Sequence, residues 1–170
     1  MKWLGALLFL GACSWGGFEW SRKFSKRPQH IRQLKNALQI LEAEILYSQL
    51  PLQEAFLTIS KQTPKPTRTF FYFLSEQMKD KNKDLIEIWE DAVHEFMEIS
   101  YIGPNEREIL YQFGKTLGQH DFTQQQKHIQ LTINHLEREL QDARDDDHKY
   151  GKMAKSLGFL SGLFIVLLLI

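Results

Sequence analysis

The residues of this chain that could hold a metal ion are two pairs in which an aspartate precedes a histidine by three positions. These pairs are Asp91 with His94 and Asp145 with His148. Helical bundles bind metals through carboxylates and histidines at this spacing when facing helices supply further glutamates. Such glutamates are not evident, and Asp91 and His94 fall opposite the apolar stripe of their own segment. We interpret both pairs as parts of solvated polar faces and expect no metal site.

Signals for catalysis or for a bound cofactor are equally weak. The chain contains no GxxxxGK[ST] or GxGxxG phosphate-binding loop and no GxSxG nucleophile motif. His128 and His135 are two helical turns apart, and nothing completes a ligand set around them. The single cysteine, Cys13, excludes an intramolecular disulfide and a cysteine-based zinc site. We predict a protein that is not an enzyme and has no cofactor.

One segment concentrates negative charge. Between Lys83 and Arg107 there is no lysine or arginine, and six acids follow each other at helical spacing: Asp84, Glu87, Glu90, Asp91, Glu95 and Glu98. Like charges three or four residues apart slightly destabilise a helix. Two interpretations stay open: an ordinary solvated face, which we favour, or a face that meets a basic partner. In the second case Glu87, Asp91 and Glu95 are the candidate contacts.

Length and charge balance limit the class of protein. At 170 residues the chain has room for one domain with anchors. Its 21 lysines and arginines balance 21 aspartates and glutamates. No excess of positive charge is available to neutralise phosphates, so nucleic acid is not expected as a partner.

The two ends of the chain read as transmembrane helices. Residues 1–20 and 157–170 are almost free of charge, and tryptophans mark the expected membrane interfaces of the first run. Basic linkers, 21–28 and 149–156, flank the middle of the chain. By the positive-inside rule both linkers are cytoplasmic, so the domain at 29–148 faces the cytoplasm and both termini face outward.

The amino terminus has a second interpretation. Residues 10–13 resemble a lipoprotein cleavage box, and cleavage before Cys13 would leave an external, lipid-anchored protein. We favour the spanning helix, because the apolar run continues to Phe18 and basic residues follow at once.

Gly158 and Gly162 form a GxxxG pair in the second apolar run. Such pairs allow close packing of membrane helices. General enrichment of glycine in membrane helices explains the pair equally well.

The middle of the chain is predicted to be all-helical. Apolar residues recur every three or four positions in six segments, which begin near Ile31, Pro51, Phe70, Leu85, Pro104 and Asp121. Short connections between helices favour antiparallel neighbours, so we predict a six-helix antiparallel bundle.

Four residues are predicted to shape the helix connections. Pro51 and Leu52 open the second helix, where proline is tolerated in the first turn. Gly118 is placed to cap the fifth helix, and Asp121 with Gln124 resembles a capping box for the sixth.

The sequence resembles the stage III sporulation protein AB family of endospore-forming bacteria. The segments that carry the resemblance are Arg27–Phe56, Gln112–Glu137 and Lys155–Ile170, so it covers essentially the whole chain. Residues 50–56, LPLQEAF, are also similar to a pattern of the GspF inner-membrane platform proteins of type II secretion and type IV pilus systems. The resemblance implies a GspF-like bundle.

The resemblance also implies a function. The chain would be a platform or coupling subunit of the secretion-like channel between mother cell and forespore, in the mother-cell-derived membrane around the forespore. Its expected partners are the stage III sporulation AA-type secretion ATPase, other membrane subunits, membrane lipid and further copies of itself. In the matching segments Glu42, Glu44 and Gln126 are candidate contacts, with capping or packing between helices as the alternative interpretation. The alternative is a membrane signalling adaptor that binds a cytoplasmic regulator through the acidic helix.

Overall fold

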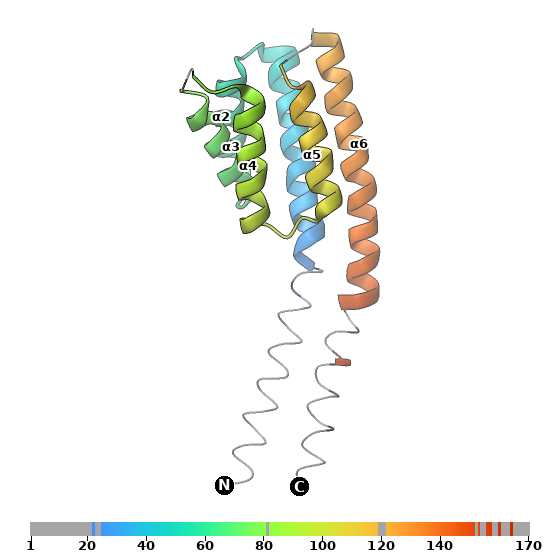
Figure 1. Ribbon diagram of the computed structural model, residues 1–170. Helices are drawn as coiled ribbons and strands as arrows, with labels where there is room; N and C mark the ends of the chain where they lie inside the picture. Colours follow the sequence, from blue (N-terminus) through green and yellow to red (C-terminus); the bar gives the residue numbers. More distant parts are fainter. Residues whose placement is uncertain are drawn as a thin grey trace, which may run out of the picture. The chain divides into compact units, whose positions relative to one another are not determined.

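All regular structure in the described part of the chain is helical, which confirms the all-α prediction. The computed structural model describes residues 22, 25–80, 82–118, 122–151, 153, 156–157, 160 and 164 (Figure 1). The chain divides into two compact units, one of residues 29–140 and one of residues 1–28 with 141–170. We call the first unit, residues 29–140, the bundle. The predicted domain boundaries stay predictions.

The helices follow the apolar periodicity of the sequence. Residues 25–43 form a first helix that continues into a π-helical turn, η1 (Glu44–Ser48). The others are α2 (Leu52–Gln62), α3 (Thr67–Gln77), α4 (Leu85–Ile99), α5 (Pro104–Thr116), α6 (Phe122–Asp146) and the π-helical η2 (Asp147–Gly151). Within the bundle, α2 packs against α3, α3 against α4, and α4 against α5. Figure 1 shows α4, α5 and α6 running in alternating directions.

Local chemistry ends the helices where the sequence indicates. Gln49 adopts a left-handed conformation after η1, and Pro51 precedes α2 as its N-cap with an extended ψ of 144°. Pro51 therefore lies one position outside the predicted first turn. Pro104 is the first residue of α5, where its missing N–H costs nothing. The buried carboxylate of Glu106 accepts a hydrogen bond from the Gly103 N–H at 2.7 Å and closes the start of that helix.

Aromatic side chains from four helices form the centre of the bundle. Phe70 of α3 lies edge-on to Trp89 of α4, with ring centroids 5.3 Å apart, and Phe113 of α5 lies 5.4 Å from Trp89 on another side. Phe56 of α2 and Phe96 of α4 extend the cluster. Rings in such tilted contacts bury large apolar areas and fix the relative positions of the helices.

Trp89 also sets how closely α5 approaches α4. Its Nε1 donates a hydrogen bond to the Leu110 carbonyl at 2.8 Å, so the buried indole has its polar partner. A Cβ added to Gly114 would lie 2.2 Å from Cδ1 of Trp89. Only glycine fits at this point of α5, because the indole occupies the space of a side chain.

The unit that contains both ends of the chain has its own polar contacts. Arg27 lies 3.6 Å from a carboxylate oxygen of Asp146, and Ser25 donates a hydrogen bond to Asp147. Farther along, a stripe of exposed apolar residues in helical conformation consists of Met153, Leu157, Leu160 and Phe164.

No helix among the residues that the structure describes is long and apolar enough to cross a membrane. Residues 1–20 and most of 157–170, Gly158 and Gly162 included, lie outside those residues. The two transmembrane helices and the packing role of the glycines stay predictions.

Candidate docking surfaces

The acidic residues of α4 lie together on one exposed face. Glu87, Glu90, Asp91, Glu95 and Glu98 are all exposed, whereas the opposite side of α4 buries Trp89 and Phe96 in the bundle. At 3.6 residues per turn the acids occupy less than half of the helix circumference. Lys83 lies 3.9 Å from Asp91, a long contact between two exposed groups. Such an exposed ion pair contributes little to stability, and one lysine does not neutralise five acids, so the face stays strongly negative.

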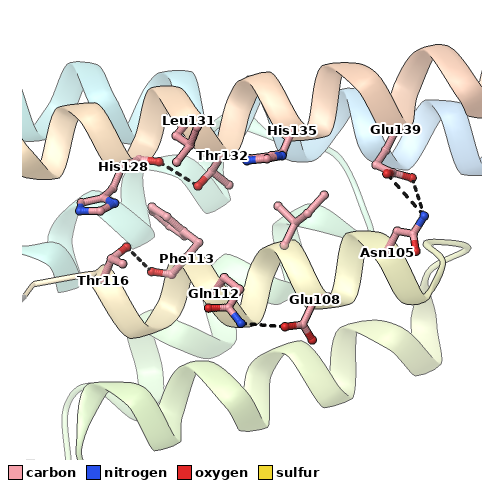
Figure 2. A pocket seen from close by; sticks show the side chains of 11 residues that line it. Asn105, Glu108, Gln112, Phe113, Thr116, His128, Leu131, Thr132, His135 and Glu139 are labelled. Carbon is pink, nitrogen blue, oxygen red and sulfur yellow. Dashed lines mark hydrogen bonds between the residues drawn. The ribbon is translucent and has the colours of Figure 1, made fainter.

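A groove of about 410 Å³ runs between α5 and α6 (Figure 2). Ile109 and Phe113 of α5 and Leu131 of α6 form its apolar part. Leu131 is 54% exposed and borders the groove, so its side chain adds apolar surface that a docking partner can reach. The groove is not predictable from the sequence, whose only signal is that Leu131 lies off the apolar stripe of its helix.

Polar side chains line the two ends of this groove. Figure 2 shows His128 and Thr116 at one end and Asn105 with Glu139 at the other, where the amide of Asn105 donates to the carboxylate at 3.3 Å. Glu108 accepts a hydrogen bond from Gln112 on the α5 side at 2.8 Å. The groove thus has an apolar floor and two carboxylates toward one end, an arrangement that suits an amphipathic helix with basic flanking residues.

Two of the predicted contact residues bind each other inside the bundle. Glu42 of the first helix accepts hydrogen bonds from the side-chain amides of Gln126 at 3.1 Å and Gln130 at 2.7 Å on α6. Lys35 and Glu137 form a second link between the same helices, with 2.6 Å between Nζ and Oε2. Glu42 and Gln126 therefore hold the first helix to α6, whatever else they contact. Glu44 lies in η1, half-buried.

The residues predicted at helix connections are placed as follows. Gly118 follows α5 with a φ of +76°, the left-handed conformation expected of a glycine at this position, and its N–H donates to Oε1 of Gln125 at 3.0 Å. Leu52 begins α2 and approaches Gly118. Asp121 lies outside the described residues, and α6 is described from Phe122.

A second groove, of about 520 Å³, lies where α2 and α3 meet. Its lining residues are Leu57, Ser60, Lys61, Lys65, Arg68, Thr69 and Tyr72. Three of them are cations and none is an acid, so this surface has the opposite charge to α4. No local sequence pattern predicts this groove, because its cations come from two helices and a loop.

The polar pairs considered for metal binding are exposed. Asp91 and His94 lie on the outer face of α4, and Asp145 and His148 are also exposed. Within the described residues no group of three or more His, Cys, Asp or Glu side chains could hold a metal ion.

After the end of α3, a hydrogen bond of 2.6 Å to Glu76 raises the pKa of Lys79 above its usual value.

Three comparisons relate the chain to known proteins. Residues 2–170 match the family model described as stage III sporulation protein AB. A relative called stage III sporulation protein AB, from Bacillus subtilis (strain 168), is 45% identical over 170 residues, which is 99% of each chain. A solved structure of a stage III sporulation protein AB superposes with a TM-score of 0.68 at 41% identity, over 72% of this chain and 96% of that one.

Proposed function

Because this chain belongs to the stage III sporulation protein AB family, we propose that it is a non-catalytic membrane subunit of the sporulation secretion-like channel complex. In this proposal the bundle acts as a platform of the GspF kind. It docks a cytoplasmic secretion ATPase of the stage III sporulation AA type and couples it to the membrane assembly.

The groove between α5 and α6 is the observation that carries the docking proposal. Docking of a helix into a groove needs an exposed apolar floor with polar groups at its margins. Leu131, Ile109 and Phe113 supply the floor, and Glu108 and Glu139 supply negative charge at one end. A helix of the ATPase with an apolar stripe and a lysine or arginine toward one end would fill this groove.

Membrane anchoring is the second part of the proposal. The apolar runs at 1–20 and 157–170 and the basic linkers beside them support it. Met153, Leu157, Leu160 and Phe164 form an exposed apolar stripe. Exposure of these four side chains to water is unfavourable, so the stripe supports a lipid environment. The domain then faces the mother-cell cytoplasm, where the ATPase would meet it.

The test is binding of the full-length chain, in detergent, to the purified ATPase over a range of salt concentrations. We expect binding that survives high salt, because the floor of the groove is apolar, and we expect Leu131→Glu to weaken it by about tenfold or more. Tyr47→Glu is the matched control, since Tyr47 is exposed and lies outside the groove.

Two outcomes would count against this proposal. If the folded wild-type chain does not bind the ATPase, direct docking is wrong. If binding persists in Leu131→Glu and disappears in Asp91→Lys/Glu95→Lys, the ATPase contacts α4 and the groove is not its site.

A further inference from the structure

The groove between α2 and α3 carries concentrated positive charge. Lys61 comes from the end of α2, Lys65 from the connecting loop and Arg68 from the start of α3. In the part of the chain that the structure describes, none of these three side chains forms an ion pair with a carboxylate. The positive charge of these three side chains is therefore available to a docking partner.

The groove also contains residue types that are common in protein interfaces. Nε of Arg68 donates a hydrogen bond to the carbonyl of Thr63 at 3.0 Å, which holds the guanidinium group against the loop. Tyr72 lies at the margin with 51% of its surface exposed, and Leu57 supplies an aliphatic wall. Arginine and tyrosine are the residue types that most often carry the binding energy of protein interfaces.

The exposed face of α4 complements this groove. It presents five acids on one side of the helix, with the exposed Ile99 at its last residue and the exposed Tyr101 two residues beyond it. An acidic helix with apolar groups at one end could pair its carboxylates with the three cations of the groove and bury the apolar groups beside Tyr72.

The charge distribution indicates where such a helix would come from. The chain as a whole is neutral, but α4 concentrates acids on one face and the α2–α3 groove concentrates three cations. No ion pair between these two surfaces is present in the described residues, so one copy does not neutralise itself. A neutral molecule with two separated, opposite surfaces is complementary to a second copy of itself.

We propose that the acidic face of α4 in one copy docks on the α2–α3 groove of a second copy. Because the two surfaces differ, the contact is heterologous and leaves one free surface of each kind at the ends of the pair. Repetition of such a contact generates a ring or an open row of subunits. This inference goes beyond the proposed docking of an ATPase and uses different surfaces, so either proposal can fail without the other.

The test uses charge reversal in the full-length chain, purified in detergent at low salt. The α4 variant is Asp91→Lys/Glu95→Lys, and the groove variant is Lys61→Glu/Arg68→Glu. We expect the wild type to form oligomers in sedimentation velocity, and each variant to associate about ten- to a hundredfold more weakly. The matched control is Asp142→Lys/Asp145→Lys, which changes the total charge as the α4 variant does but lies off both surfaces and should associate normally.

A chain that carries all four reversals provides the decisive measurement. Its α4 face keeps Glu87, Glu90 and Glu98, so association depends on close pairing of the two new lysines with the two new glutamates of a second copy. We expect the fourfold variant to associate more strongly than either double variant. An equimolar mixture of the two double variants should also associate, because it supplies one unchanged surface of each kind. Loss of folding or a general change of charge cannot restore association in this way.

The proposal is wrong if the wild type stays monomeric at low salt. It is also wrong if the fourfold variant does not associate, or if both double variants associate as the wild type does. Binding of the ATPase to the fourfold variant, measured in parallel, separates these outcomes from a failure of the docking proposal, because the groove between α5 and α6 is unchanged.

Discussion

Replacement of Gly114 by alanine should destabilise the bundle, although alanine is the better helix former. Gly114 lies inside α5, where exchange of glycine for alanine normally contributes about 1 kcal/mol in favour of the folded state. Here the new Cβ would lie 2.2 Å from Cδ1 and 2.7 Å from Cγ of Trp89. Both separations are far below a normal carbon–carbon contact, so either the indole or the helix must move.

Neither movement is easy. The indole of Trp89 is fully buried, donates to the Leu110 carbonyl at 2.8 Å, and has the rings of Phe70 and Phe113 packed against it. Tilting the indole breaks its hydrogen bond, and withdrawing α5 opens space in the aromatic cluster. Overpacking of a core typically costs about 1–3 kcal/mol. A buried donor left without a partner adds about 1–3 kcal/mol.

After the gain in helix propensity is subtracted, the net loss is about 3 kcal/mol of unfolding free energy. For a domain of this size that corresponds to a melting temperature lower by about 10–15 °C. This change in melting temperature can be measured by thermal unfolding of the full-length chain in detergent, followed by circular dichroism.

The double variant with Trp89→Phe tests the cause. A smaller ring leaves room for the new Cβ, so Gly114→Ala should cost at least about 1 kcal/mol less in that background. A melting temperature of Gly114→Ala equal to or above that of the wild type would refute the close approach of α5 to Trp89.

Two further substitutions test the helix connections. Gly118→Ala should lower the unfolding free energy by about 1–2 kcal/mol, because φ is +76° and the new Cβ would lie 3.1 Å from Leu85. An unchanged urea midpoint would contradict this backbone conformation. Glu42→Ala should cost about 1 kcal/mol, since Gln126 loses its acceptor, whereas Glu44→Ala should change stability by less than about 0.5 kcal/mol. Equal urea midpoints for the two glutamate variants would show that the link to α6 contributes nothing.

The helices and their ends were predictable because their causes are local. Apolar spacing of three and four residues placed the helical segments, and the residues that end them act within one turn. Pro104 opens α5 and Gly118 follows it, as predicted. The difference at Pro51, which is the N-cap of α2 instead of a first-turn residue, amounts to one position.

The roles of the charged residues were only partly predictable. The acidic face of α4 was evident, because all of its members come from one helix and helical spacing alone brings them together. The family resemblance predicts Glu42 and Gln126 as contacts to a partner, with packing between helices as the alternative. The structure shows that these two residues, 84 positions apart in the chain, bind each other between the first helix and α6. No local pattern predicts such a pair.

The sequence by itself determined the all-helical class, the six segments, the negative face of α4 and the membership of a sporulation family. All of these follow from periodicity, from turn chemistry or from similarity along the chain. The tertiary structure decided where α5 and α6 leave an apolar groove around Leu131 and where Lys61, Lys65 and Arg68 meet. The physical reason is that a groove consists of the space left between elements, and that space depends on how side chains such as Trp89 set the distances between helices.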